Sequence, residues 1–504
     1  MSKIIRRREF KEATRLKTLR RQARMELKER HKTEGLSCSI RQTPSNGKSS
    51  FQTVEQERAA RQEAMGEYLL VLRKILPHII ERFSKVPDFR NPRKTKHKIA
   101  VLLMFGLLTF VFQKASRREA NRELTTAAFL ENLQTLFPDI EALPHHDTLN
   151  RVLAVIDVNE IERIQVDMIK KFIKSKKFVN YLIDTCYPIA IDGTQKLSYD
   201  FLWAEECQQH CYQKKKRYSC SVLEACLAFH NGMVLPLATE MLSYMEGEQG
   251  SDKQDCETKA FKRLAQKIKG YFPKLKVMVL LDGLYPNGPI IELCQRYRWQ
   301  FMMVLKDDTL SSVWEEYEGL KMLESTNCFT TAWGTRRQRF HWVNGIEYCY
   351  GPNERKRQIV HVVVCEEHWE EISRDSDAIV EKTLKHAWIS SDPLTRLNVH
   401  QRCNLGARYR WGIEGEFLVE KRYGYQYEHA FSFTWNAMKG YHLLMRLAHF
   451  INVFAEHTEL LRARFVHVGV KAFIKFLDET IRGPWLDHEW IKKKLRAPYQ
   501  MRMA

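Results

Sequence analysis

The sequence predicts an α/β fold: a mixed sheet with flanking helices, preceded by an all-helical region and followed by further helices. Three observations support this prediction. From about residue 53 to 180, apolar residues recur with the spacing of amphipathic and buried helices. From residue 181 onward, short apolar runs typical of strands alternate with segments typical of helices. After about residue 440, the spacing is helical again.

The composition indicates which partners and compartment to expect. The chain has 504 residues, enough for two to four domains if one domain takes about 100–200 residues. Its 81 Lys and Arg residues exceed its 61 Asp and Glu residues, and the formal charge of +20 favours nucleic acid first and an anionic membrane second. The apolar stretch from Ile99 to Phe112 is shorter than the roughly 20 residues that cross a bilayer, so we expect a buried helix and no membrane partner. Twelve scattered cysteines without a recognisable signal peptide indicate reduced thiols and a cytoplasmic location.

The first two predicted segments are a basic arm and a helical domain. Residues 1–32 hold thirteen Lys or Arg against four Asp or Glu residues. Within an arm and linker of residues 1–52, we expect either a basic helix that becomes ordered on a polyanion or a solvated tail without consequence. Residues 53–180 are the predicted helical DNA-binding domain, in which Asp147 or Thr148 is expected to cap a helix.

Residues 181–307 carry the first part of the predicted sheet. The strand "YPIAID" ends at Asp192, and two further strands follow it, separated by the turn "HNG". An amphipathic helix, the strand "KVMVLLD" ending at Asp282, a second helix and the strand "QFMMVLK" complete this part. Three strands followed by alternating helices and strands describe a mixed sheet that helices cover.

The sheet pattern is then interrupted and resumes. Residues 308–384 form a predicted insertion that is mainly β, with a hairpin around Asn344 and Gly345. Residues 385–440 hold the second part of the sheet domain, namely the strand "KHAWISSD" and a long helix after it. Residues 441–504 form the predicted C-terminal helical region.

Two of the predicted strands end in Asp-Gly, at Asp192 and at Asp282. One such ending is a common transition from strand to turn, but these two strands can be neighbours, and sites form at the strand ends of open sheets. Two carboxylates within about 4 Å repel each other by roughly 4 kcal/mol at an effective dielectric near 20, so they need a cation or a raised pKa. Oxygen ligands of this kind suit Mg²⁺ or Mn²⁺, and two such ions can hold both the attacking and the leaving oxygen of a phosphoryl transfer.

The helix predicted around "RWGIEGEFLVEK" carries a third candidate carboxylate. At about 100° per residue, Arg410, Glu414 and Lys421 fall within about 40° of one another, on one stripe bordered by apolar residues. Glu416 and Glu420 point about 200° and 240° away from Glu414 and are expected to be solvated. The stripe fits either a metal-binding carboxylate with phosphate-binding cations or an ion-pair network on the surface.

These residues resemble the motifs of the DDE transposases of bacterial insertion sequences. Asp192 in "IDGT" and Asp282 in "LLDG" resemble the two aspartates of that family. Arg410, Glu414 and Lys421 match its YREK signature, in which Tyr, Arg, Glu and Lys are separated by two, three and six residues.

The resemblance covers roughly residues 85–450 and implies an RNase H-like catalytic core. It implies that Asp192, Asp282 and Glu414 are catalytic and bind two Mg²⁺ ions, for which Mn²⁺ can substitute. The implied reaction is cut-and-paste transposition, with cleavage at the element ends and strand transfer into target DNA, in some members through a hairpin intermediate. The implied partners are double-stranded DNA, as terminal inverted repeats and as target, and a second copy of the chain in a synaptic complex at the bacterial nucleoid.

The resemblance also implies DNA contacts, beginning with Arg410 and Lys421. The expected place of the signature tyrosine holds Ala407, and Tyr409, two positions later, is the candidate in its place. Two basic runs are further candidates for phosphate contacts, although each also fits a plain solvated face. They are Lys214, Lys215, Lys216 and Arg217, expected in a loop near the first strand, and Arg93 and Lys94.

Two other patterns leave alternatives open. Cys207 and Cys211 fit either a zinc site or buried and loop thiols. The tryptophans of the insertion fit core packing or, for one of them, support of a flipped base, a role that the resemblance implies for an aromatic residue there. These tryptophans are Trp314, Trp333, Trp342 and Trp369. A domesticated DNA-binding protein without catalysis and an RNase H-like nuclease are the alternative functions.

Overall fold

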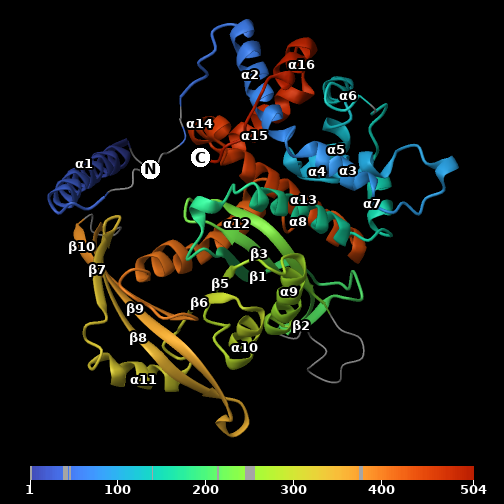
Figure 1. Cartoon of the computed structure of the whole chain (residues 1–504). Coiled ribbons are helices and arrows are strands. Elements are labelled where there is room, and N and C mark those ends of the chain that lie inside the picture. Colours follow the sequence, from blue (N-terminus) through green and yellow to red (C-terminus); the bar gives the residue numbers. More distant parts are fainter. Residues whose placement is uncertain are drawn as a thin grey trace. The chain divides into compact units, whose positions relative to one another are not determined.

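The computed structural model describes residues 3–37, 44, 47–138, 140–212, 215–243, 256–373 and 378–504. The chain divides into two compact units, each built from two stretches of sequence. Unit 1 comprises residues 1–42 and 278–407, and unit 2 comprises residues 43–277 and 408–504. Each unit combines helices with strands (Figure 1), which confirms the predicted α/β class. The six predicted domains divide the chain more finely than these units and stay a prediction.

Unit 2 begins and ends with helices. The helices of its first stretch are α2 (Val54–Leu72), α3 (Leu76–Ser84), α4 (Ile99–Val111), α5 (Arg117–Glu123), α6 (Ala127–Gln134), α7 (His146–Leu153), α8 (Asn159–Lys174) and, after the strands, α9 (Glu257–Tyr271). The helices of its second stretch are α12 (Gly412–Arg422), α13 (Trp435–Glu456), α14 (Glu459–Val468), α15 (Val470–Arg482) and α16 (His488–Arg496). The two stretches share one core, because α13 packs against α4, α7 and α8, and both α15 and α16 pack against α2.

The apolar stretch expected to be a buried helix is α4, and most of its residues are buried. Gly106 lies where α4 crosses its neighbours, since a Cβ there would meet Leu149 of α7 at 2.7 Å and Leu444 of α13 at 2.8 Å. Among the residues that the structure describes, no helix is both long and apolar enough to cross a bilayer.

Helix α7 begins earlier than expected. Its N-cap is His145, whose ring nitrogen accepts a hydrogen bond from the amide of Asp147 at 3.2 Å. An N-cap side chain satisfies the free amides of the first turn, and the His145 ring does so here. Asp147 and Thr148 therefore lie inside the first turn, and the expected cap at either residue is wrong.

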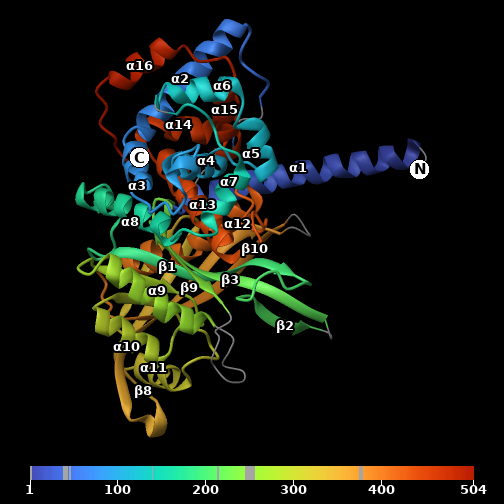
Figure 2. The same cartoon turned by 90° about the vertical axis from the view of Figure 1, so that its right-hand side faces the viewer.

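The strands of unit 2 are β1 (Tyr187–Tyr199), β2 (Gln208–Tyr212), β3 (Lys215–Ala228) and β4 (Val234–Leu242). Strand β3 pairs antiparallel with β1 along one edge, and with β2 and then β4 along the other. Figure 2 shows β2 and β3 projecting as a hairpin. The predicted turn between β3 and β4 is confirmed, with Gly232 at a φ of 88°.

Strand β1 does not end at Asp192, as the sequence had indicated. Asp192 pairs with Glu224 of β3, and β1 continues past a bulge to Tyr199. The Asp-Gly step stays in the ladder because Gly193 leaves room for another side chain: a Cβ there would collide with the carboxylate of Glu257. Asp192 consequently lies within the sheet.

Helices cover both faces of this part of the sheet. Neighbouring residues of a strand point to opposite faces. Gly193 faces Glu257 at the start of α9, whereas Asp192 contacts Arg410 just before α12. Helix α12 therefore covers the face that bears Asp192, and α9 covers the other.

The strands of unit 1 lie in the order β5, β6, β10, β9, β8, β7. Their bounds are β5 (Val277–Leu281), β6 (Gln300–Val304), β7 (Cys328–Trp333), β8 (Arg336–Tyr350), β9 (Lys356–Ile372) and β10 (Ile379–Ser390). Strands β5 and β6 are parallel, and the other pairs are antiparallel, so the sheet is mixed. The helices of this stretch are α10 (Gly288–Tyr297), α11 (Ser311–Lys321) and a π-helical turn at Gln401–Gly406.

The hairpin predicted around Asn344 and Gly345 is wrong. Strand β8 runs through both residues, and its register with β9 shifts between Val343 and Ile346. Gly345 has a φ of 79°, and the side chain of Asn344 accepts a hydrogen bond from the amide of Leu394 at 2.8 Å. The Asn-Gly pair therefore forms a bulge, which needs the same left-handed glycine as a tight turn.

The basic arm is a helix, α1 (Lys3–Thr33), which lies beside β9 in unit 1 (Figure 1). Two ion pairs of 2.8 Å hold its C-terminal end, one between Arg30 and Glu370 and one between Glu34 and Arg337. Most side chains from residue 12 to residue 30 are exposed. This part of α1, from residue 12 to residue 30, thus presents its basic residues to solvent.

Candidate active site

Arg410 joins two of the predicted catalytic carboxylates in unit 2. Its Nη2 donates a hydrogen bond to Glu414 Oε1 at 2.8 Å, and its Nη1 lies 3.4 Å from Asp192 Oδ2. Arg410 reaches both because the short 3₁₀ segment η6 (Ala407–Trp411) leads directly into α12, one turn before Glu414. The structure thus brings together side chains that lie 218 residues apart in the sequence.

The three side chains differ in their exposure. Arg410 is 8 % exposed and Asp192 19 %, whereas 52 % of the Glu414 side chain is exposed. A guanidinium between two carboxylates offsets their mutual repulsion. A ligand that comes from solvent therefore reaches Glu414 most easily, with Asp192 deeper in the same group.

The remaining signature residues lie on either side of this group. Lys421, two turns further along α12, pairs with Glu428 at 3.1 Å and keeps 23 % of its side chain exposed. Tyr409 is half-buried in η6, and burial raises the pKa of its phenol. Their contacts with DNA stay predictions.

Asp282 belongs to unit 1 and follows the last residue of β5, as predicted. Its Oδ1 accepts a hydrogen bond from the amide of Leu284 at 2.9 Å. Gly283 leaves room for a lysine, because a Cβ there would meet Lys306 Cε at 2.5 Å. Since β5 and β6 are parallel, Lys306, which follows β6, is a cation at the same sheet edge as Asp282. Sequence reasoning missed this lysine, and the proximity of Asp282 to the carboxylates of unit 2 stays a prediction.

The predicted basic runs are exposed where the structure describes them. Lys215–Arg217 open strand β3 and pair with β2, so they lie in a strand and not in the expected loop. Lys214 lies outside the described residues. The second run forms the 3₁₀ turn η1 (Pro92–Lys94), in which the side chain of Asn91 accepts a hydrogen bond from the amide of Arg93 at 3.0 Å.

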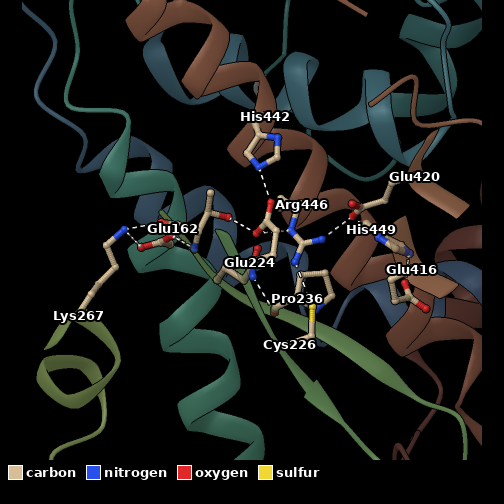
Figure 3. A network of polar contacts seen from close by, with 12 residues as sticks. Glu162, Glu224, Cys226, Pro236, Lys267, Glu416, Glu420, His442, Arg446 and His449 are labelled. Carbon is tan, nitrogen blue, oxygen red and sulfur yellow. Dashed lines mark hydrogen bonds and ion pairs between the residues drawn. The ribbon is translucent and has the colours of Figure 1, made fainter. Parts of the chain in front are cut away.

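Glu416 and Glu420 are not solvated, so that expectation is wrong (Figure 3). Glu420 is fully buried, and its Oε1 lies 2.7 Å from Arg446 Nη1 and 2.6 Å from His449 Nδ1. Glu416 pairs with the other ring nitrogen of His449 at 2.7 Å. The expectation failed because α13 packs on the face of α12 that points away from Glu414.

The same network continues into the sheet (Figure 3). Arg446 Nε lies 3.3 Å from Glu224 Oε2 on β3. Glu224 also accepts hydrogen bonds from His442 at 2.8 Å and from the hydroxyl of Thr239 at 2.6 Å. The amide of Thr239 in turn donates to Glu162 of α8 at 2.8 Å. One chain of polar contacts therefore links α12, α13, the sheet and the helical region.

The charges in this network hold its members in defined protonation states. Burial favours the neutral form of Glu420, but Arg446 and His449 outweigh it and lower its pKa to about 2. Burial likewise disfavours the cation of His449, but Glu416 and Glu420 outweigh it and raise its pKa to about 9. Burial lowers the pKa of His442, which donates as a neutral ring. Glu420 is therefore an anion and His449 a cation at neutral pH.

One sequence signal could have revealed these contacts. Arg446 and His449 interrupt an otherwise apolar helical stretch, "LLMRLAHF". Charged side chains on a buried helix need partners of opposite charge. Glu420, on a helix just before that stretch, is such a partner.

Strand β1 carries a buried lysine, Lys196, four residues after Asp192. Its Nζ donates a hydrogen bond to the carbonyl of Tyr427 at 2.9 Å and lies 4.6 Å from the centre of the tyrosine ring. Burial lowers the pKa of Lys196 to about 8. Lys196 thereby ties the segment after α12 to the strand that bears Asp192.

The structure describes some of the tryptophans and cysteines for which the sequence left two interpretations open. Trp342 is buried in the core, and Trp369 stacks under Arg336, whose Cζ lies 4.1 Å from the ring centre. Cys207 is buried just before β2, and the side chain of Cys211 lies outside the described residues. Zinc binding stays a hypothesis.

The donors of unit 2 fit a hard divalent cation. Asp192 and Glu414 supply carboxylate oxygens, and Mg²⁺ usually binds one or two carboxylates while it keeps waters or takes phosphate oxygens from a substrate. Among the described residues, no three His, Cys, Asp or Glu side chains are gathered as a ready-made metal cage. An oxygen-only pair of this kind suits Mg²⁺ or Mn²⁺ better than zinc.

Residues 80–168, from within α3 to within α8, match a family described as DDE_Tnp_1-associated. The match indicates a DDE-type transposase family. The transposase-associated segment lies entirely in unit 2, the unit of Asp192, Arg410 and Glu414, and it contains the exposed Arg93 and Lys94. No curated protein sequence matches the chain.

Proposed function

We propose that the protein is a DNA transposase that moves an insertion sequence by cut-and-paste transposition. The observation that carries the proposal is the contact of Asp192 and Glu414 through Arg410, in the unit that also holds the transposase-associated segment. Two carboxylates, one on a sheet and one on the helix that covers it, suit a phosphoryl transfer that uses divalent cations. Asp282 supplies the third carboxylate of an RNase H-like core.

Each residue has a role in this proposal. Asp192, Asp282 and Glu414 would hold two Mg²⁺ ions, and such ions, when bound, would activate the attacking oxygen and stabilise the leaving oxygen. Arg410 would exchange these carboxylates for a phosphate of the DNA, to which its guanidinium would donate hydrogen bonds. Lys421, on the same stripe of α12, contacts the next phosphates. Water is the nucleophile at the element ends, and a 3′-hydroxyl is the nucleophile in strand transfer, with a hairpin intermediate on one route.

The charge of the molecule supports DNA as the partner. The formal charge is +20, and exposed basic residues lie on α1 from residue 12 to residue 30, on η1, and at Lys215–Arg217 of β3. Such residues bind phosphates regardless of sequence, and the resulting affinity falls as salt rises. We propose that two copies of the chain hold the two element ends together, in the cytoplasm of a bacterial cell.

The test uses duplexes that end in the inverted repeats flanking the gene. We expect Asp192→Ala, Asp282→Ala and Glu414→Ala each to reduce Mg²⁺-dependent cleavage by about a thousandfold, equivalent to about 4 kcal/mol in the barrier. Binding of the same duplex should stay within a few-fold of wild type. Asp308→Ala, which removes an exposed carboxylate of unit 1, is the matched control and should cleave normally. Full cleavage by any of the three variants would contradict the role of that residue.

Two other outcomes point to the alternative functions. Binding without cleavage in both Mg²⁺ and Mn²⁺ would favour a domesticated DNA-binding protein. Cleavage without joining of the 3′-hydroxyl to target DNA would favour an RNase H-like nuclease.

A further inference from the structure

A second arginine bridges the sheet and α12 behind the first. Arg446 of α13 lies between Glu224 of β3, at 3.3 Å, and Glu420 of α12, at 2.7 Å (Figure 3). Its Nη2 also contacts the sulfur of Cys226 on β3 at 3.2 Å. Glu224 and Glu420 are fully buried, and the Arg446 side chain is 2 % exposed. We call these three charged residues the inner bridge.

The inner bridge runs parallel to the contact at the candidate active site. Glu224 is the direct cross-strand partner of Asp192, and directly opposed side chains point to the same face of a sheet. Glu420 lies on the same helix as Glu414. The outer bridge of Asp192, Arg410 and Glu414 and the inner bridge therefore join the same two elements, the sheet and α12, through two different arginines.

We propose that Arg446 is a positioning residue that sets the separation of Asp192 and Glu414. The proposal rests on the proposed function, in which those two carboxylates act on DNA. Arg446 contacts neither Asp192 nor Glu414. It acts by holding Glu224, the cross-strand partner of Asp192, and α12, the helix that carries Glu414.

The outer bridge is partly exposed and the inner bridge is buried, and this difference explains why a second bridge is needed. The outer bridge opens to solvent at Glu414, and in the proposed reaction Arg410 exchanges its carboxylates for a phosphate. At that moment the outer bridge no longer holds α12 on the sheet. The inner bridge is buried, so no ligand displaces it, and it keeps Asp192 and Glu414 in place while Arg410 moves.

Helix geometry shows that even a small rotation of α12 would displace Glu414 enough to matter for catalysis. A glutamate carboxylate lies about 6 Å from the helix axis, so a rotation of α12 by about 10° moves Glu414 by about 1 Å. A misplacement of about 1 Å in a catalytic group can cost about a hundredfold in rate. His449 adds a second hold against such a rotation, because it pairs with both Glu416 and Glu420, one turn apart on the inner face of α12.

The experiment compares two variants of the inner bridge with a matched control. Glu420→Gln keeps the shape of the side chain and removes its charge. Arg446→Lys keeps the positive charge but removes the planar guanidinium that contacts both glutamates. Asp478→Asn is the control, because it breaks another buried ion pair of unit 2, at 2.6 Å from Lys114, whose residues lie neither on α12 nor on α13. All are full-length proteins, compared by single-turnover cleavage at saturating DNA, by DNA affinity, by melting temperature and by hydrogen exchange of the α12 amides.

We expect Glu420→Gln and Arg446→Lys to cleave about 10- to 100-fold more slowly than wild type, with DNA affinity within about twofold. Exchange of the α12 amides should be faster in both variants. Asp478→Asn should lower the melting temperature by about as much as the two bridge variants do. Its cleavage rate and the hydrogen exchange of its α12 amides should stay at the wild-type values. Cleavage by both bridge variants at the rate of Asp478→Asn would overturn the proposal.

The readouts separate this proposal from the proposed function. If wild type and all variants fail to cleave DNA, the proposed function fails, and hydrogen exchange still decides whether Arg446 holds α12. Unchanged α12 exchange in Glu420→Gln and Arg446→Lys would overturn the positioning role in that case too. If Glu420→Gln does not fold, Arg446→Lys, which leaves the net charge of the cluster intact, carries the test alone.

Discussion

The buried Lys196 makes a quantitative prediction about stability and pH. Its ammonium group is buried against the ring and carbonyl of Tyr427, and burial lowers its pKa from 10.5 to about 8. The unfolded chain holds the proton up to about pH 10.5, whereas the folded chain releases it near pH 8. The unfolded state therefore binds more protons between these pH values, and the free energy of unfolding rises with pH across this window.

The size of the effect follows from the same two pKa values. The gap between 10.5 and about 8, at about 1.36 kcal/mol per pH unit, amounts to on the order of 3 kcal/mol. Lys196 is buried, so solvent screening does not reduce this figure much. Lys196→Met keeps the length of the side chain and removes the titrating group. The variant should therefore lack the part of the rise in unfolding free energy with pH that Lys196 causes in wild type.

The assay is urea unfolding of wild type and Lys196→Met at intervals from pH 7.5 to pH 10.5. The stability of wild type minus that of the variant should increase by on the order of 3 kcal/mol across the range. Lys215→Met, which removes an exposed lysine of β3, is the matched control. Taking differences removes the titration of the other groups. A Lys196 difference that stays constant within about 0.5 kcal/mol would refute the reasoning, because the lysine would then titrate equally in both states.

Two further predictions concern the same unit. His449 has its pKa raised from 6.5 to about 9, so its stabilisation is complete below pH 6.5 and is lost as pH rises through about 9. His449→Gln should remove this loss from urea unfolding curves measured between pH 6 and pH 9.5, and an unchanged pH dependence would speak against the buried cation. Gly106→Val should destabilise the protein by about 1–3 kcal/mol, because the added carbons collide with Leu149 and Leu444 where α4 crosses its neighbours. A melting temperature equal to that of wild type would show that the crossing is looser than described.

Local patterns in the sequence were enough for most elements. The strand that ends before Asp282, the buried helix α4 and the amphipathic helix α9 form as predicted, because each depends on the spacing of apolar residues within one short segment. The contact of Arg410 with Glu414 was also predictable, since residues four apart on a helix are neighbours.

The errors come from contacts between distant segments. A helical wheel of α12 shows which residues share a face, but it does not show that a second helix covers the opposite face. Glu420 was therefore expected in solvent, although it is fully buried against Arg446 and His449. Asp192 was placed at a strand end for a similar reason: Asp-Gly resembles a turn unless Glu257 is known to lie against the glycine.

The order of the units along the chain has a consequence for synthesis. Residues 278–407, about 130 in number, separate the two stretches of unit 2. At about 5–20 residues per second, a ribosome needs on the order of ten seconds to pass them. During that time β1 and β3 have been made but α12 and α13 have not. Asp192 therefore lacks its partner Arg410, and Glu224 lacks its partner Arg446. A nascent chain, or one cut short by a stop codon before η6, has its first carboxylates but neither arginine, and both bridges form only after α13 has been made.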